Sequence, residues 1–363
     1  MKKVVVLIND TTYAYNLRTA IFRELLSQRF EVVIVGRLLR HVDQLAEIGC
    51  RLINVETDRQ HANPLSDFML IIRYFCILKK ENPDVVLTYN IKPNVYGGII
   101  CKQLQIPYIV NVTGLGKPLG TSGLLEIVAR RLYKYGISKS QCVFFQNKSN
   151  LQYFLKHKLL KGQKRYLLPG SGVDLDYYTY TELPEDEEIH FLFAARIIKE
   201  KGVDYILAAA EKNTNKKIVF DICGSCEDKQ YYQKLTNISS IHYHGEQDDL
   251  RPFYQRCICF LFPSYYPEGL SNVLLEACAS GRPIITTANP GCQEIVEDGV
   301  NGYLIPANNQ EELDEAIKKY LALSIDQKKN MGYEARRIVE AKYDRKQVVI
   351  KYMEIINQIV HDV

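Results

Sequence analysis

The sequence predicts an α/β fold in which two doubly wound, Rossmann-like domains face each other across a cleft. Three observations support this prediction. A chain of 363 residues has the length of two domains. Short runs rich in Val and Ile alternate with amphipathic stretches along both halves. These runs lack the strict alternation of half-exposed strands, which indicates parallel strands buried on both faces and covered by helices.

The first domain is expected to span residues 1–170. Its expected strands are Val4–Ile8, Glu31–Val35, Val85–Thr88, Tyr108–Val112 and Cys142–Phe145. Its expected helices are Leu17–Gln28, Asp67–Lys80, Pro93–Leu104 and Leu124–Tyr135. Because helices alternate with the strands, the sheet should be parallel.

The second domain is expected to span residues 171–343, after a link near Leu168–Tyr180. Its expected strands are Ile189–Ala194, Lys217–Ile222, Ser240–His244, Ile258–Phe262 and Pro283–Thr286. Its expected helices are Val203–Lys212, Lys229–Thr236, Leu250–Arg256, Ser271–Ser280 and Glu311–Leu321. A last helix within residues 344–363 can pack on either domain, including back on the first.

The total charge of +4 hides an uneven distribution. Residues 1–170 hold 25 Lys and Arg against 11 Asp and Glu, whereas the rest of the chain holds 21 against 31. Such a basic half favours a polyanionic partner, either nucleic acid or an anionic membrane surface, over a merely solvated face. Within the basic half, Tyr153–Leu168 mixes Lys and Arg with Leu, Tyr and Phe and is a candidate membrane-contacting segment. The alternative is that it forms a surface helix and loop.

The chain contains no run of 18 apolar residues, and the best candidate, Phe68–Leu78, is too short to span a bilayer. The first residues of the chain resemble a buried β-strand more than a signal peptide. We therefore expect a cytoplasmic protein with reduced cysteines. Cys223 and Cys226 lack a second pair at matched spacing, and His242 and His244 lack a third ligand. A metal site is therefore disfavoured.

The most informative stretch follows the expected strand that ends at Phe262. A loop with Pro and Gly leads into a helix near Ser271, and the first amides of a helix form an anion site suited to a diphosphate. Glu268 and Glu276 bracket this site, and carboxylates accept hydrogen bonds from pairs of sugar hydroxyls. The stretch therefore suggests a nucleotide-sugar site; the alternative is that both glutamates are solvated helix-end charges.

A second segment supports this interpretation. Arg196 and Lys201 leave another strand toward the same cleft, where they could neutralise a leaving diphosphate. Pro169–Asp174 is expected to form a flexible turn at the link between the domains. Gly281–Thr286 and Asn289–Ile305 complete the pattern.

These segments resemble the donor-binding half of retaining GT-B glycosyltransferases of glycosyltransferase family 4. The Glu-x7-Glu pair, the Arg…Lys-Gly segment, the Gly-Val-Asp loop and the Glu-Ile-Val…Gly-x-Leu stretch occur in the order of that family, mostly within residues 165–310. In the first half, Tyr89–Gly97 and Asn111–Gly116 resemble the capsule and O-antigen branch. Those enzymes extend polyprenyl-diphosphate-linked saccharides.

The resemblance implies a role for each matching residue. Arg196 and Lys201 would hold the donor diphosphate, Glu276 the ribose and Glu268 the transferred sugar, so Glu268, Arg196 and Lys201 are the catalytic candidates. The remaining donor-binding candidates are Gly245, Gly269, Leu270, Ser271 and Asn272. No metal or other cofactor is expected, because basic side chains and helix amides take the place of a metal; Asp174 and Asp176 only mimic a metal-binding motif of another fold.

Two departures from the family concern the first domain. Thr113 occupies a region where many relatives have a histidine, and no histidine lies between His61 and His157. The expected loop Asn9–Asn16 has no glycine, so Asn16 and Arg18 are assumed to replace a glycine pair. The candidates for the acceptor or cleft are Asn16, Arg18, Lys92, Asn94, Thr113, Gly114 and Lys117.

We therefore expect a retaining glycosyltransferase, peripheral on the inner face of the plasma membrane. It would move a sugar from a nucleotide sugar, UDP-linked by expectation, to a polyprenyl-diphosphate-linked saccharide. Its basic half would contact the anionic membrane surface, with no nucleic acid partner. The alternatives are another GT-B enzyme, such as a sugar phosphorylase or a nucleotide-sugar epimerase, and a non-catalytic basic surface-binding protein.

Overall fold

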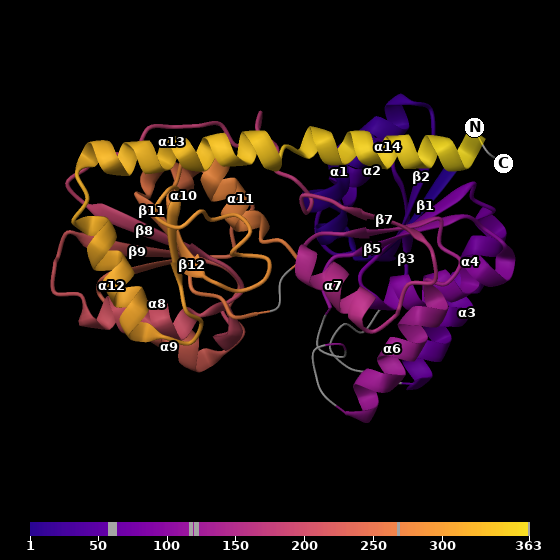
Figure 1. Cartoon of the computed structure of the whole chain (residues 1–363), viewed down its shortest axis with the longest axis horizontal. Helices are drawn as coiled ribbons and strands as arrows, with labels where there is room; N and C mark the ends of the chain where they lie inside the picture. The colour runs from indigo at the N-terminus through magenta and orange to yellow at the C-terminus, as the bar shows by residue number, and fades with distance from the viewer. Residues whose placement is uncertain (57–63, 116–118, 120–122, 267–268, 362–363) are drawn as a thin grey trace. The chain divides into compact units, whose positions relative to one another are not determined.

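The computed structural model describes residues 1–56, 64–115, 119, 123–266 and 269–361 (Figure 1). The chain forms two compact units. Unit 1 comprises Met1–Ser171 and Lys346–Val363, and unit 2 comprises Gly172–Arg345. The final helix thus belongs to unit 1, one of the two arrangements that the sequence left open.

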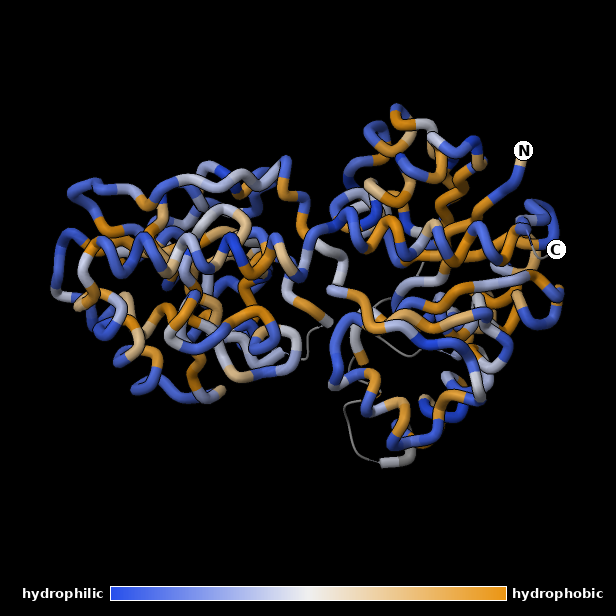
Figure 2. The backbone as a smooth tube through the Cα atoms, turned by 45° about the horizontal axis from the view of Figure 1, so that its top comes forward, coloured by the Kyte–Doolittle hydropathy of each residue, from blue (hydrophilic) through white to orange (hydrophobic). Residues whose placement is uncertain are grey.

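Unit 1 contains a seven-stranded parallel sheet in the order β3-β2-β1-β4-β5-β6-β7. The strands are β1 (Lys3–Asp10), β2 (Glu31–Arg37), β3 (Arg51–Asn54), β4 (Val85–Tyr89), β5 (Tyr108–Val112), β6 (Cys142–Phe145) and β7 (Lys164–Leu167). Every residue of β4, β5 and β6 is buried, as the unbroken apolar runs predicted. Figure 2 shows hydrophobic residues recurring along the chain in both units.

Helices cover both faces of this sheet. They are α1 (Thr11–Ser27), α2 (Val42–Glu47), α3 (Pro64–Glu81), η1 (Pro93–Gly97), α4 (Gly98–Leu104), α6 (Leu124–Gly136), α7 (Lys148–Lys156) and α14 (Arg345–His361). Alternate residues of β1 pack into two different hydrophobic cores, because neighbouring side chains of a strand point to opposite faces of the sheet. Val4 and Val6 pack with residues of α1 and α14, and Val5 and Leu7 with residues of α3, α4 and α6.

The sequence missed β3, β7, α2 and α7. Both strands lie at the edges of the sheet and carry mostly exposed or half-buried residues, so neither has an apolar run. The expected loop Asn9–Asn16 was wrong, because α1 begins directly after β1. Asp10 caps this helix by accepting a hydrogen bond from the Tyr13 amide at 2.9 Å.

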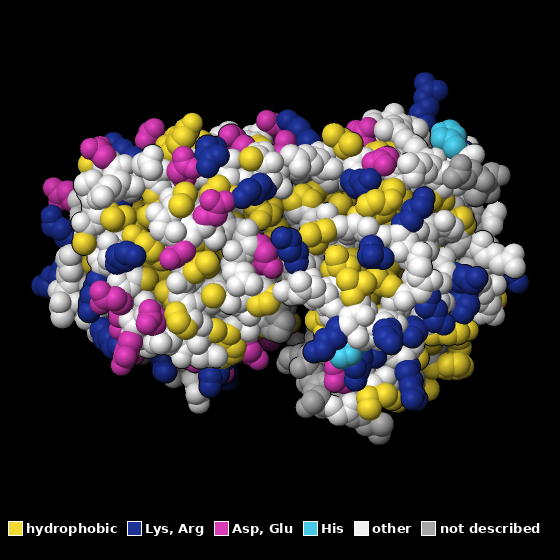
Figure 3. Space-filling view, viewed as in Figure 1, with side chains coloured by type: hydrophobic (Ala, Val, Ile, Leu, Met, Phe, Trp, Pro, Cys, Tyr) yellow, Lys and Arg dark blue, Asp and Glu magenta, His cyan; other side chains and the backbone are white. Residues whose placement is uncertain are grey.

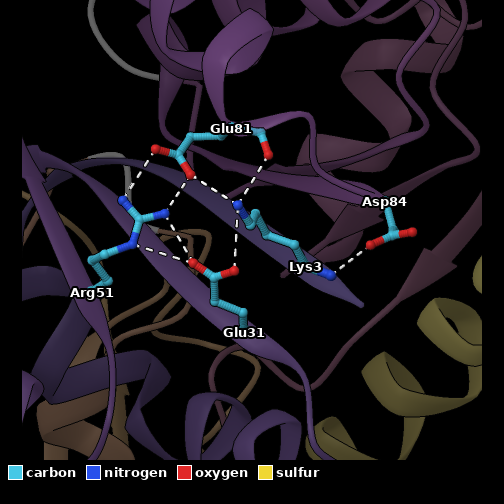
Figure 4. Close-up of polar contacts among 5 residues, drawn as sticks. All are labelled: Lys3, Glu31, Arg51, Glu81 and Asp84. Atoms are coloured by element: carbon cyan, nitrogen blue, oxygen red, sulfur yellow. Dashed lines mark hydrogen bonds and ion pairs between the residues drawn. The ribbon is translucent and has the colours of Figure 1, made fainter. Parts of the chain in front are cut away.

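An ion cluster ties together the amino ends of β1, β2 and β3 and the end of α3 (Figure 4). Lys3 Nζ lies 3.3 Å from Glu31 and 3.1 Å from Glu81. Arg51 Nη2 pairs with Glu31 at 2.9 Å and also with Glu81. The Lys3 amide donates to Asp84. The cluster lies at the edge of the sheet opposite to the one where ligands of such folds bind.

Unit 2 contains a six-stranded parallel sheet in the order β10-β9-β8-β11-β12-β13. The strands are β8 (Ile189–Ala194), β9 (Ile218–Cys223), β10 (Ile241–Gly245), β11 (Cys259–Phe262), β12 (Ile284–Thr287) and β13 (Gly302–Ile305). The helices are η2 (Lys199–Lys201), α8 (Val203–Lys212), α9 (Lys229–Asn237), α10 (Arg251–Arg256), α11 (Asn272–Ala279), α12 (Gln310–Leu321) and α13 (Ile325–Lys342). The two sheets confirm the predicted α/β class, although β13 and α13 were not expected.

The segment Pro169–Asp174 contains a turn at Gly170 and Ser171, as expected, and its end is held by backbone hydrogen bonds. The Val173 amide donates to the Tyr343 carbonyl at 2.9 Å, and the Arg345 amide donates to the Val173 carbonyl at 3.0 Å. Gly172 has φ +65°, and a Cβ there would lie 2.5 Å from the Arg345 Cα. The start of unit 2 is therefore fixed to its end by backbone pairing.

Candidate functional site

The carboxyl edge of the unit 2 sheet gathers most of the predicted donor residues. All six strands are parallel, so the loops after β8, β9, β10, β11 and β12 leave the sheet at the same edge. Arg196 and Lys201 follow β8, and Gly245 ends β10. Gly269–Ser271 lies between β11 and α11, and Asn272 and Glu276 lie within α11.

Arg196 and Lys201 lie against the same aromatic ring, that of Tyr266. Arg196 Cζ lies 5.8 Å from the ring centre, and Lys201 Nζ lies 5.1 Å from it. Lys201 Nζ is also 5.3 Å from the ring of Phe262. Two cations brought to one place, one of them exposed, form a local positive potential that suits an anionic ligand.

The loop that carries Tyr266 is held in place by η2. The amides of Tyr265 and Tyr266 both donate to the Glu200 carbonyl at 3.0 Å, and Asn289 Nδ2 donates to the Tyr266 carbonyl at 2.8 Å. Gly202 follows η2 with φ +84°, and a Cβ there would lie 2.3 Å from the Pro263 carbonyl oxygen. Only glycine fits this close approach, so the loop and the cation pair have a defined spacing.

The start of α11 offers backbone amides beside this loop. Gly269, Leu270 and Ser271 are buried, and the Ser271 amide donates to the Gly291 carbonyl at 2.9 Å. The side chain of Ser271 does not cap the helix. The next amides have no partner within the helix by their position, so an anion could accept their hydrogen bonds.

Glu276 is held by tyrosines. Tyr254, which is fully buried, donates its hydroxyl to Glu276 Oε2 at 3.2 Å and to the Val273 carbonyl at 3.2 Å. Burial raises the pKa of Glu276, although the hydrogen bonds from Tyr254 and Tyr178 and the charge of Arg345 oppose this rise. Glu276 is therefore an oriented carboxylate and not the solvated helix-end charge of the alternative interpretation.

Gly245 ends β10 with φ +67°, and its carbonyl accepts a hydrogen bond from the Gly224 amide at 2.7 Å. His244 of β10 and His190 of β8 flank the buried carboxylate of Asp221. His244 Nε2 lies 2.6 Å from Asp221 Oδ1, and His190 Nδ1 lies 2.8 Å from Asp221 Oδ2. Within the part of the chain that the structure describes, no group of three or more His, Cys, Asp and Glu could hold a metal ion.

Two predicted site residues, Glu268 and Lys117, fall outside the described residues, as does Gly116 of the quoted motif. Their roles remain predictions.

In unit 1, two predicted acceptor residues are buried. Asn94 is 0% exposed; its Oδ1 accepts from Thr88 Oγ1 at 2.7 Å, and its Nδ2 donates to the Asn111 carbonyl and the Tyr133 hydroxyl, both at 2.8 Å. The prediction that Asn94 contacts an acceptor was wrong, because its hydrogen bonds stabilise the fold. Arg18 is 2% exposed, with its guanidinium 4.6 Å from the ring centre of Tyr89, so it is not open to a ligand either.

The other unit 1 candidates are more accessible. Asn16 is exposed on α1, and Lys92 Nζ forms an ion pair with Asp67 at 2.8 Å. Thr113 and Gly114 are half-buried after β5. The sequence missed Asn90, whose side chain accepts from the Asn9 amide at 3.3 Å and donates to Thr113 Oγ1 at 3.5 Å. Asn90 thus connects the ends of β1 and β4 to the segment after β5.

Two family models match the chain, one in each unit. The model described as glycosyl transferase 4-like matches residues 3–147, and the model described as glycosyl transferases group 1 matches residues 181–338. The chain belongs to the GT-B glycosyltransferases. The second match contains Arg196, Lys201 and Glu276, so the predicted donor residues lie in the segment that the family shares.

Two curated relatives of this glycosyltransferase are similar over most of its length. It is 26% identical, over 96% of each chain, to N,N'-diacetylbacillosaminyl-diphospho-undecaprenol alpha-1,3-N-acetylgalactosaminyltransferase of Campylobacter jejuni. It is 23% identical, over 79% of each chain, to UDP-Gal:alpha-D-GlcNAc-diphosphoundecaprenol alpha-1,3-galactosyltransferase of Escherichia coli.

Solved structures confirm the fold of this glycosyltransferase. A glycosyltransferase from Rickettsia africae superposes with a TM-score of 0.81 at 17% identity, covering 100% of this chain and 99% of the other. HepE of Anabaena in complex with UDP superposes with a TM-score of 0.79 at 15% identity, covering 99% of this chain and 100% of the other. In the described part of this glycosyltransferase, every helix is too short or too polar to cross a bilayer.

Proposed function

We propose that this glycosyltransferase moves a sugar from a UDP-sugar to a polyprenyl-diphosphate-linked saccharide, with retention of the anomeric configuration and without a metal ion. The observation that carries the proposal is the pair of cations, Arg196 and Lys201, on the ring of Tyr266. They follow β8 and share the carboxyl edge of the sheet with the start of α11. Together these groups can neutralise a diphosphate as it leaves.

This charge balance supports the proposal that the enzyme needs no metal ion. Two cations and a helix amino end supply the positive charge that a divalent ion supplies in other nucleotide-sugar enzymes. Glu276 is suited to the ribose, because an oriented carboxylate accepts hydrogen bonds from two neighbouring hydroxyls. Tyr254 limits the rotation of this carboxylate, since it binds Oε2 and the backbone of the same helix.

Retention is proposed to result from attack on the same face of the sugar that the diphosphate leaves. A hydroxyl oxygen of the acceptor forms a bond to the anomeric carbon as the bond from that carbon to the phosphate oxygen breaks. The proton of the hydroxyl passes to the leaving phosphate oxygen. This route requires no histidine base, in keeping with the absence of histidine between His61 and His157.

The acceptor class is proposed from the relatives. The names of the Campylobacter jejuni and Escherichia coli enzymes both specify an undecaprenol-diphosphate acceptor. Such acceptors reside in membranes, and the basic unit 1 would hold the enzyme as a peripheral protein on the inner face of the plasma membrane. The product would be an intermediate of a surface polysaccharide such as capsule or O antigen.

The test is a transfer assay with the purified protein, a polyprenyl-diphosphate saccharide and a panel of radiolabelled nucleotide sugars. We expect transfer from a UDP-sugar that EDTA does not inhibit, and an NMR coupling constant of the product that matches the donor anomer. Transfer should be lost in Arg196→Ala and Glu276→Ala. Transfer that persists in both variants would contradict the site, and inhibition by EDTA would contradict metal independence.

A further inference from the structure

We propose that the outward face of α3, extended by α6, is the surface that contacts an anionic lipid bilayer. The inference rests on the proposed lipid-linked acceptor and names the part of unit 1 that would meet the membrane. Both helices contribute residues to the same core of unit 1, among them Tyr74 of α3 and Tyr133 of α6, so they cover the same face of the sheet. Figure 3 shows Lys and Arg beside hydrophobic side chains on this part of unit 1.

Helix α3 is apolar on two opposite sides. Its inner side buries Leu70, Tyr74 and Leu78 in the core. Its outer side exposes four large apolar side chains, at 41–72% of their surface: Leu65, Phe68, Met69 and Ile72. Their spacing of three, four and seven residues places them in one stripe along the helix. A water-soluble surface helix would carry polar residues there, so a contiguous stripe indicates a binding face.

The charges of α3 are sorted between the same two sides. Its acidic residues are held in ion pairs within unit 1: Asp67 with Lys92, and Glu81 with Lys3 and Arg51. Its basic residues, Arg73, Lys79 and Lys80, are exposed, and they form no ion pair with any residue that the structure describes. The outer face therefore combines an apolar stripe with uncompensated positive charge.

Helix α6 repeats this arrangement. Val128, Leu132 and Tyr135 are 40–53% exposed and lie four and three residues apart, on one side of the helix. Arg131 is exposed among them, and Lys102 of α4 places its Nζ 3.8 Å from the ring centre of Tyr135. Both helices thus expose apolar and basic side chains while packing in the same core of unit 1.

A bilayer with anionic headgroups fits this face better than other partners. Interfacial helices bury Leu, Phe and Ile at the boundary of the acyl chains while Lys and Arg bind the headgroups. A nucleic acid would leave the apolar stripe in water. The membrane-contacting segment that the sequence suggested, Tyr153–Leu168, is less suited. Phe154 and Leu159 are buried in the core, and the Tyr153 hydroxyl donates to Glu126.

The experiment measures co-sedimentation of the full chain with phosphatidylcholine vesicles that contain or lack phosphatidylglycerol. We expect binding that requires phosphatidylglycerol and weakens at high salt. The double variant Phe68→Ser/Ile72→Ser should bind about tenfold more weakly, because it removes two side chains from the lipid contact. The matched control is Ile325→Ser/Tyr333→Ser on α13 of unit 2, which removes two comparably exposed apolar side chains. All variants should unfold at the temperature of the wild type within a few degrees.

Three outcomes would contradict the proposal that α3 and α6 contact the bilayer. They are equal binding of wild type and the α3 variant, equal loss in the α13 control, and displacement of the protein from vesicles by DNA at low concentration. Transfer to a water-soluble, short-chain acceptor provides the separate readout. We expect the α3 variant to retain it while losing transfer to a long-chain acceptor in vesicles. Binding that depends on α3, without transfer from any donor, would keep the surface and reject the proposed function.

Discussion

The carboxyl edges of the two sheets carry polar side chains in opposite states. In unit 1, Thr88, Asn94 and Asn111 bind one another, and Tyr352 closes the set by donating to Asn111. In unit 2, Arg196 and Lys201 lie against an aromatic ring. The position after a parallel strand is the same in both units, so position alone does not identify a binding residue. What distinguishes the two edges is burial, because the three unit 1 residues are buried whereas Arg196 is exposed and Lys201 is half-buried.

The largest expected effect concerns the cations of unit 2. Arg196→Ala and Lys201→Ala should each lower kcat by about 10²–10³, because each removes positive charge from the departing diphosphate. Steady-state transfer kinetics with saturating donor measure this loss. The control is Lys199→Ala, an exposed lysine of the same turn, which should retain its rate. An equal loss of kcat in Lys199→Ala would mean that any positive charge in this turn has the same effect. It would contradict the contrast between the two edges.

The next effect tests the self-satisfied edge of unit 1. Asn94→Ala should lower the free energy of unfolding by about 3 kcal/mol, because it leaves the Tyr133 hydroxyl and the Asn111 carbonyl buried without their partner. Denaturant unfolding monitored by circular dichroism measures this. The exposed Asn16 of α1 supplies the control Asn16→Ala, expected within about 0.5 kcal/mol of wild type. Lost activity with unchanged stability would instead make Asn94 a ligand contact.

A third prediction separates stability from function at Glu276. Burial raises the pKa of this carboxyl above its ordinary 4.5, so its ionised form is less favourable in the folded state than in the unfolded state. Glu276→Gln should therefore stabilise unit 2 at pH 7 by about 1 kcal/mol, while the KM for the donor rises about tenfold.

The stability gain should disappear below pH 4.5, where the carboxyl is protonated in both states. Thermal unfolding at several pH values measures this, with the exposed Glu211→Gln as the control. A destabilised Glu276→Gln variant would mean that the tyrosines and Arg345 outweigh the cost of burial.

The smallest expected effect concerns the ion cluster at the amino ends of the unit 1 strands, on the side of the sheet opposite to Asn94. The hydrogen bond from Arg51 lowers the pKa of Glu81 against the opposing influence of burial, and Lys3 adds to this decrease. A lowered pKa means that the carboxylate stabilises the fold above its ordinary 4.5 and that this contribution is lost as the pH falls through the folded value.

Glu81→Gln should thus cost about 1 kcal/mol at pH 7, since Arg51 is partly solvated, and nothing in strong acid. Urea unfolding at pH 7 and pH 3 measures the difference. An equal cost at both pH values would show that packing, and not charge, holds this edge.

The sequence predicts those parts of the molecule that local residue patterns determine, and it misses those that tertiary contacts determine. β8 and α8 were predicted with their observed bounds, because a buried strand and an amphipathic helix each have a clear period. Arg196 and Lys201 were predicted because they follow such a strand. Tyr254 could not be assigned to Glu276, because they lie on different helices and only the tertiary fold brings them together. Asn94 was misassigned for a related reason, since its burial depends on Tyr133, 39 residues further along the chain.

The helix α14 has a consequence for how the protein is made. It contributes Val348, Tyr352 and Ile356, among others, to a core of unit 1 whose members outside this helix lie before residue 171. A ribosome releases unit 2 completely before it releases this helix, so unit 2 can finish folding first although unit 1 begins earlier. Until α14 emerges, the apolar side chains of unit 1 that pack against it stay uncovered.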